Sequence, residues 1–272
     1  MTALIIGSEG TLGIITKAYL KIWPKPENVA RILAFFRTIK EAGLAIAEIK
    51  ERVIPEMAEF LDRMSLDNVP DVIRYPADTS YALIVDASGS TETIKRRTDE
   101  MESILKRYAI ETRSTTNKDE MDRISLARKG LYGAILKLRR KEGEYVVIGD
   151  IVVPVSELPS ALEEIEKARD EDGIRSPLVG HIGDGNIHTN AFVDLQNRNE
   201  MEKVNKFMVD LAMIAIRHGG SVSAEHGIGI EKKNLLIEEM KYNNNMKTLE
   251  LMRVIKAIFD PKNILNRGNI FD

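Results

Sequence analysis

Hydrophobic and polar positions change period along this chain in a way that predicts strands and helices in turn. Three runs rich in β-branched residues are predicted strands: 31–36, 81–87 and 145–154. Helical spacing of apolar residues predicts helices over 39–51, about 91–108, 117–140, 156–169, about 200–218 and 246–259. Ser156 is the expected N-cap of the fourth helix, and 53–63 is expected to be extended.

This alternation lacks the long, continuously hydrophobic strands of a parallel sheet. It therefore predicts an α+β fold, in which helices pack on one face of a mainly antiparallel sheet. Two further strands, 3–7 and 13–23, are expected around the glycine-rich stretch GSEGTLG. The prolines of PKPE (24–27) favour extended backbone and suggest a boundary, which divides the chain into 1–25 and 26–272.

Composition narrows the class of protein. The 272 residues are 43% hydrophobic, which supports a proper core, and a net charge of −3 argues against a nucleic-acid binder. No apolar run approaches the roughly 20 residues that span a bilayer, and the N-terminus lacks the pattern of a secretory signal. The absence of cysteine excludes disulfides and thiolate chemistry. We expect a cytoplasmic protein, with peripheral attachment to the inner face of the membrane as the alternative.

Two of the four histidines bracket a glycine-rich stretch, H-I-G-D-G-N-I-H, from His181 to His188. If its Asp-Gly pair forms a two-residue type I′ turn, the two histidines become opposed hairpin residues with Cβ atoms about 4.5–5.5 Å apart. Such a pair could share one divalent cation, and the segment SAEHG offers Glu225 or His226 as a third ligand. The competing interpretation is a hairpin whose histidines are ordinary surface or core residues.

Longer motifs resemble a known family. GHIGDGNIH (180–188), SVSAEHGIGIEKK (221–233) and FDPKNILNRG (259–268) occur in the order found in the C-terminal half of FAD-linked 2-hydroxyacid dehydrogenases. These enzymes belong to the vanillyl-alcohol-oxidase superfamily and include D-lactate dehydrogenases, D-2-hydroxyglutarate dehydrogenases and the glycolate oxidase D subunit. ISLARKGLYGA (124–134) and DIVVPVSELP (150–159) extend the match upstream.

The resemblance implies a ferredoxin-like cap domain for 26–272 and makes 1–25 the terminal strands of an FAD-binding domain. The rest of that domain would then be supplied by another chain or by a missing upstream segment. FAD is expected to lie close to the following residues: Gly7, Ser8, Gly10, Thr11, Gly13 and Ile14.

The resemblance also implies a divalent metal, zinc above all with manganese or iron as alternatives, held by His181, His188 and Glu225. The adjacent His226 would be the base that takes the substrate's hydroxyl proton, so Glu225 and His226 form the expected catalytic pair.

Arg128 is expected to bind the substrate carboxylate, because a guanidinium matches a carboxylate geometrically; a solvated helix arginine is the alternative. Asn190 is expected to face the substrate. Some relatives carry a substrate-binding lysine where this chain has Ile148, which favours a small hydroxy acid over a bulky dicarboxylate.

Three functions are therefore weighed. The leading hypothesis is the substrate- and metal-binding half of a flavin-dependent dehydrogenase. It would oxidise a small 2-hydroxy acid, of the D-lactate or glycolate type, to the 2-oxo acid, and it would be active only with the FAD-binding part. A metal-dependent hydrolase would need no flavin. A non-catalytic subunit or truncated remnant would bind neither metal nor flavin partner. A homo-oligomer is compatible with the leading hypothesis.

Overall fold

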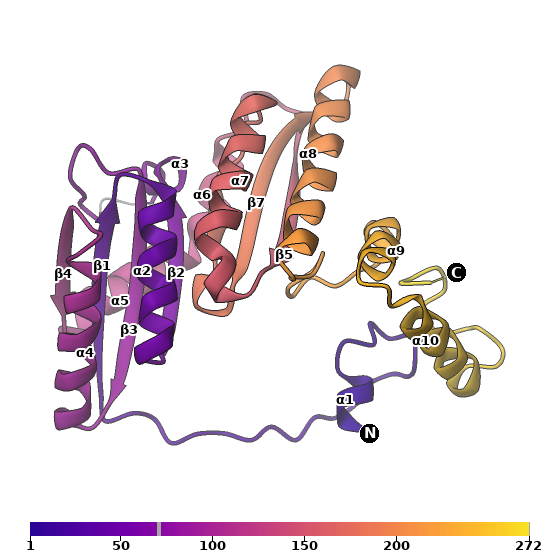
Figure 1. Ribbon diagram of the computed structural model, residues 1–272, viewed down its shortest axis with the longest axis horizontal. Helices are drawn as coiled ribbons and strands as arrows, with labels where there is room; N and C mark the ends of the chain where they lie inside the picture. The colour runs from indigo at the N-terminus through magenta and orange to yellow at the C-terminus, as the bar shows by residue number, and fades with distance from the viewer. Residues whose placement is uncertain (70–71, 272) are drawn as a thin grey trace.

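The computed structural model describes residues 1–69 and 72–271, and this part of the chain contains a seven-stranded antiparallel sheet (Figure 1). Its strand order is β4-β1-β3-β2-β6-β7-β5. The strands are β1 (Asn28–Phe36), β2 (Met57–Asp62), β3 (Tyr81–Gly89), β4 (Glu111–Thr115), β5 (Glu144–Val152), β6 (Leu178–Gly180) and β7 (Asn186–Asp194).

Helices cover both faces of this sheet. One face carries the long helices α2 (Ile39–Arg52), α4 (Thr91–Leu105), α7 (Leu158–Glu171) and α8 (Arg198–Arg217), which lie in front of the sheet in Figure 1. The other face packs against α3 (Arg63–Leu66), α5 (Lys118–Lys129) and α6 (Leu131–Lys137). The predicted α+β class with an antiparallel sheet is confirmed, and the layer of short helices on the second face is an addition to the prediction.

The strand sequences explain the two layers. In β1 successive side chains point to opposite faces, so Ile32 and Ala34 enter the core under the long helices while Leu33 and Phe35 enter the core under the short ones. Helix α2 begins at a capping box, in which the Thr38 hydroxyl accepts from the backbone N–H three residues on. Burial on both faces explains the apolar runs 32–36 of β1 and 82–85 of β3, whereas a buried charged residue of these strands is paired, as Arg31 is with Asp86.

Several predicted elements differ from the structure. Residues 3–7 lie in and just after a short helix, α1 (Thr2–Ile5), and 13–23 form no strand within the described ranges. The predicted helix 117–140 is split into α5 and α6 at Gly130. Ser156 does not cap α7; it lies in a 3-10 turn, η1 (Val155–Glu157), and the N-cap residue is Glu157. Strand β4 and helix α9 (Lys233–Tyr242) were missed.

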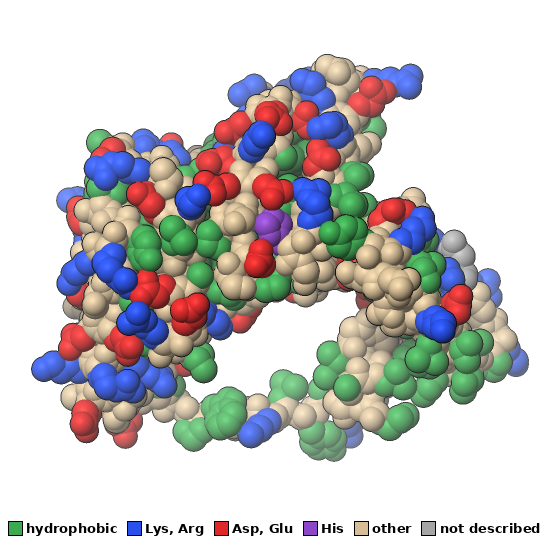
Figure 2. Space-filling model, viewed as in Figure 1, with side chains coloured by type: hydrophobic (Ala, Val, Ile, Leu, Met, Phe, Trp, Pro, Cys, Tyr) green, Lys and Arg blue, Asp and Glu red, His purple; other side chains and the backbone are tan. Residues whose placement is uncertain are grey.

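The extended segment 13–25 is exposed along its length and joins α1 to β1 across the lower edge of Figure 1. Figure 2 shows a row of hydrophobic side chains along it. Six of them are between 67% and 95% exposed: Ile14, Ile15, Tyr19, Leu20, Ile22 and Trp23. A strand sequence without a neighbouring strand cannot satisfy its backbone groups by pairing, which explains why these residues form no strand here.

The C-terminal region has a small core of its own. Helices α9 and α10 (Met246–Phe259) and the tail pack around Leu236, Leu249, Ile270 and Phe271. The N-terminal segment contacts this region, where the Asn266 amide donates to the Glu9 carbonyl, and α1 lies beside it in Figure 1. Among the described helices, none has the length and apolar character needed to cross a bilayer.

Candidate metal and substrate site

The two bracketing histidines come from the region of two neighbouring inner strands, β6 and β7, but not from opposed positions of a two-residue hairpin. His188 is the third residue of β7, and its partner across β6 is Val179 rather than His181. His181 follows β6 and precedes a 3-10 turn, η2 (Ile182–Asp184). The predicted type I′ turn is wrong, because it needs positive φ at two residues and only Gly185, with φ 80°, has it.

The 3-10 turn nevertheless folds His181 back toward His188. Their ring centroids lie 5.7 Å apart with the rings perpendicular. Glu225 and His226 reach the same place from the loop between α8 and α9, and the His226 ring stacks on His188 with centroids 5.0 Å apart. Four residues from three segments therefore converge.

The donor atoms fit a metal ion geometrically. Glu225 Oε1 lies 3.1 Å from His188 Nε2 and 3.7 Å from His181 Nε2. Ligand atoms about 2.1 Å from a tetrahedral zinc ion are about 3.4 Å from one another, and the two distances bracket that value. Two imidazoles and a carboxylate are also the ligand types that zinc, manganese and iron accept. The three predicted ligands thus form a donor set of suitable chemistry and size.

A second donor group shares one histidine with the first. Asp150, His188 and His226 also offer atoms close enough to hold an ion. Asp150, however, is 1% exposed, and its Oδ2 already accepts hydrogen bonds from the Glu225 loop. This makes Asp150 a structural anchor, and the group with Glu225 is the better candidate for a metal site.

Asp150 anchors the loop that carries Glu225 and His226. It lies in β5 directly opposite His188, and its Oδ2 accepts five hydrogen bonds of 2.9–3.3 Å. The donors are the Ser223 hydroxyl, the backbone N–H groups of Ala224, Glu225 and His226, and the Lys232 ammonium. Burial alone would raise the pKa of Asp150, but these donors and the Lys232 charge hold it below its usual value.

The surroundings of His188 favour the neutral form that a metal ligand requires. Burial lowers its pKa, since the charged imidazolium loses solvation there, and this outweighs the opposing charges of Asp150 and Glu225, while His226 and His181 act in the same direction as burial. Its Nδ1 lies 3.7 Å from Asp150 Oδ1, and within the described part of the chain this buried nitrogen has no hydrogen-bond partner. The Nε2 atom faces Glu225.

Glu59 orients His181. This glutamate of β2 is 7% exposed; its Oε1 lies 3.0 Å from His181 Nδ1, and its Oε2 accepts from the Arg128 guanidinium at 2.9 Å. The Arg128 Nη2 also lies 2.9 Å from His181 Nδ1 and 3.3 Å from its Nε2, so the carboxylate and the guanidinium together hold the ring in place. Sequence reasoning missed Glu59, although a glutamate between apolar residues of a strand was a usable signal.

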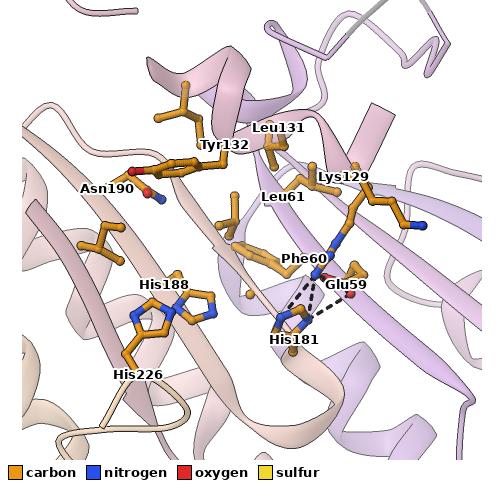
Figure 3. A pocket seen from close by; sticks show the side chains of 15 residues that line it. Glu59, Phe60, Leu61, Lys129, Leu131, Tyr132, His181, His188, Asn190 and His226 are labelled. Carbon is orange, nitrogen blue, oxygen red and sulfur yellow. Dashed lines mark hydrogen bonds and ion pairs between the residues drawn. The ribbon is translucent and has the colours of Figure 1, made fainter. Parts of the chain in front are cut away.

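A cavity of about 430 Å³ opens beside these groups (Figure 3). His181, His188 and His226 line it, as do both predicted substrate-binding residues, Arg128 and Asn190. Arg128 comes from the C-terminal end of α5 and Asn190 from β7, so the sheet and the short-helix layer each supply one. The structure therefore brings every predicted catalytic, metal and substrate residue to one place.

The predicted cofactor residues lie next to the same loop. The Glu9 carboxylate accepts from the backbone N–H groups of Ile228 at 2.6 Å and Gly229 at 2.8 Å, which fixes the glycine-rich segment beside His226. Gly7 and Gly10 have positive φ, and the backbone of Gly7 and Gly13 borders open space. Ser8 and Thr11 close a turn, in which the buried Thr11 hydroxyl donates to the Ser8 carbonyl at 2.6 Å. Ile14 is exposed. Bare glycine backbone on a surface is compatible with a flat cofactor.

The fourth histidine lies elsewhere. His218 caps the C-terminal end of α8, and its ring nitrogens lie 2.9 Å from carboxylate oxygens of Glu157 and Glu164. Burial alone would lower its pKa, but the two glutamates outweigh that effect and raise it. The raised pKa favours the charged imidazolium at this helix end, where a cation is stabilising.

Comparison with known proteins places these features in context. The family described as FAD linked oxidases, C-terminal domain, matches residues 25–270. The glycolate oxidase subunit GlcD of Bacillus subtilis is 33% identical over 275 residues, which cover 100% of this chain and 57% of that protein. The D-lactate dehydrogenase of Archaeoglobus fulgidus is 29% identical over 98% of this chain and 57% of that protein. The chain thus spans about half the length of these relatives.

Solved structures share the fold. The 4-ethylphenol oxidase of Gulosibacter chungangensis has a TM-score of 0.65 and 13% identity over 92% of this chain and 55% of that one. An alkyldihydroxyacetonephosphate synthase has a TM-score of 0.61 and 20% identity over 97% of this chain and 48% of that one. At these identities the likeness concerns the fold alone.

Proposed function

Because the chain belongs to the family of FAD linked oxidases, C-terminal domain, we propose that it is the substrate- and metal-binding half of a flavin-dependent 2-hydroxyacid dehydrogenase. The reaction would convert a 2-hydroxy acid to the 2-oxo acid. Relatives named glycolate oxidase subunit and D-lactate dehydrogenase support this substrate class. The relatives are nearly twice as long, which leaves room for an FAD-binding part; segment 1–25, with its row of exposed apolar side chains, would pair with that part.

His181, His188 and Glu225 would hold the divalent ion, with zinc as the expected metal. The bound ion supplies positive charge that lowers the pKa of the substrate hydroxyl, and bound FAD supplies the acceptor for the hydride from the hydroxyl-bearing carbon. The lowered pKa of His188 favours the neutral imidazole that a metal ligand requires, and Glu59 and Arg128 hold the His181 ring in place. Glu59 and Asp150 act as positioning residues, because each orients a ligand without providing one.

His226 is the proposed base. Its ring is about half exposed, stacks on His188 and has Nε2 3.8 Å from Glu225 Oε1, so it borders the place where the substrate hydroxyl would lie. It would take the hydroxyl proton on a ring nitrogen while the carbonyl forms. Arg128 would bind the substrate carboxylate and Asn190 would donate a hydrogen bond from its amide. Arg128 already pairs with Glu59, so its guanidinium is held at the edge of the cavity before substrate arrives.

The observation that carries the proposal is that His181, His188, His226 and Arg128 line one cavity, with Glu225 Oε1 3.1 Å from His188 Nε2. The test combines the full chain, zinc and an FAD-binding partner polypeptide with a 2-hydroxy acid and an electron-accepting dye. We expect dye reduction that depends on all components and is lost in His226→Ala. A metal-replete, flavin-bound complex that reduces no dye with any 2-hydroxy acid would overturn the proposal. Cytoplasmic location and homo-oligomerisation stay predictions.

A further inference from the structure

The cavity has two chemically different ends. Its polar end contains the three histidines and the Arg128–Glu59 pair, while Asn190 lies beside Tyr132 and directly opposite Ile148 in the sheet. Its other wall is apolar and is made of Phe60, Leu61, Leu131, Ile135, Ile148 and Val179. Figure 3 shows Leu61, Leu131 and Tyr132 on the side away from His181 and His226. A hydroxy acid whose head group lies at the histidines would therefore direct its side chain toward the apolar wall.

The size of the cavity exceeds what a short hydroxy acid needs. Lactate has six heavy atoms. Even if each atom took about 30 Å³, which is the volume per molecule in liquid water, lactate would fill only about 180 Å³. The cavity measures about 430 Å³. A metal ion held by His181, His188 and Glu225 would take part of the difference at the polar end. The space along the apolar wall would remain.

Within the described part of the chain, no lysine or arginine lies on the apolar wall to balance a second negative charge, and the polar side chains near it are those of Tyr132 and Asn190. Among the described residues that line the cavity, the Lys and Arg side chains are Arg128 and Lys129. Arg128 belongs to the polar end, where Glu59 already balances it. Lys129 is exposed, and in Figure 3 its side chain extends away from the histidines. A side-chain carboxylate against the apolar wall would be desolvated without a counter-charge, which is strongly unfavourable.

We propose that this site takes 2-hydroxy acids with an apolar side chain of several carbons, in preference to glycolate, lactate or a hydroxy-dicarboxylate. This inference rests on the proposed function and extends it by assigning the side-chain subsite. Phe60, Leu61, Leu131, Ile135, Ile148 and Val179 form that subsite. Most of them are already buried, so the subsite is preformed and binding requires little rearrangement.

The experiment is isothermal titration calorimetry of the full, zinc-loaded chain with three ligands: lactate, 2-hydroxyhexanoate and 2-hydroxyglutarate. Each methylene buried against an apolar wall tightens binding about fourfold, so 2-hydroxyhexanoate, with three more methylenes than lactate, is expected to bind up to about 60-fold more tightly. 2-Hydroxyglutarate has a comparable length, and we expect it to bind no more tightly than lactate. The comparison uses the unaltered protein and does not depend on a variant that folds.

A variant then locates the subsite. Ile148 lines the cavity and is 37% exposed, so Ile148→Asn is expected to reduce the affinity ratio between 2-hydroxyhexanoate and lactate about tenfold. The matched control is Ile54→Asn, because Ile54 is exposed and outside the cavity, and it should leave the ratio unchanged.

The possible failures are distinguishable. If lactate binds and 2-hydroxyhexanoate binds no more tightly, or if 2-hydroxyglutarate binds best, the side-chain inference is wrong while the proposed function stands. If Ile148→Asn and Ile54→Asn change the ratio equally, the assignment of the subsite is wrong. If none of the three acids binds the zinc-loaded chain, the proposed function fails together with the inference.

Discussion

Replacing Asp150 with asparagine should disorder the loop that presents Glu225 and His226. The change keeps the shape of the side chain but removes its charge and one of its two acceptor oxygens. Asp150 is buried, and its Oδ2 accepts from five donors, one of them the Lys232 ammonium. An asparagine amide would present N–H groups to a cluster that consists of donors, so part of the cluster would lose its acceptor.

The size of the effect follows from these bonds. A hydrogen bond to a charged group contributes about 1 kcal/mol more than a neutral one, and five bonds give an upper limit of about 5 kcal/mol. Because the bonds share one oxygen and are not additive, we expect Asp150→Asn to lower the free energy of unfolding by about 3 kcal/mol. For a chain of this length that corresponds to a Tm lower by roughly 6 to 12 °C. Zinc affinity should fall about 10- to 100-fold, because Glu225 is no longer positioned.

Thermal unfolding followed by circular dichroism, with and without zinc, measures the first effect, and calorimetric titration with zinc measures the second. The control is Asp184→Asn, an exposed aspartate of η2 near the same site, which should change stability by less than about 0.5 kcal/mol. If Asp150→Asn behaves like the control in both assays, Asp150 does not anchor the loop and the account of this site is wrong.

Three further predictions follow from the structure. Glu59→Gln should weaken zinc binding about tenfold or more in calorimetry, and unchanged affinity would show that Glu59 does not orient the ligand. Gly185→Ala should lower the free energy of unfolding by at least about 2 kcal/mol in chemical denaturation. Gly185 has φ 80°, and a Cβ on it would lie 1.9 Å from the Val153 carbonyl oxygen, so a smaller loss would contradict this geometry. His218→Gln should lower the free energy of unfolding by about 1 kcal/mol below pH 6.5, where the charged His218 gives its full stabilisation. This loss should become smaller as the pH rises through the raised pKa of His218, and a pH-independent difference in Tm would refute the prediction.

Local patterns predicted much of the fold. Strands β1, β3 and β5 and helices α2, α4, α8 and α10 lie where the apolar spacing placed them, because their burial follows the period of a single element. The sequence could not show which strands would find neighbours. Residues 13–23 have strand composition but no partner in the described structure, and β4 is too short and polar to stand out before β1 is known to lie beside it.

The sequence predicted which residues belong to the candidate site, but not how they are arranged. Ordered motifs indicated that His181, His188 and Glu225 meet, yet the hairpin proposed to bring the histidines together is replaced by a 3-10 turn. Glu59 and Asp150 were missed because their roles depend on contacts with residues 122 and about 75 positions away. Such contacts leave no trace in local spacing.

The central claim is that His181, His188 and Glu225 bind one divalent ion. Its most direct test is a crystal of the zinc-loaded chain measured at the zinc absorption edge. The account predicts a single strong anomalous peak about 2.0–2.2 Å from His181 Nε2, His188 Nε2 and a Glu225 oxygen. A peak on Asp150 and His226 instead, or no peak near these residues in a zinc-replete crystal, would contradict it.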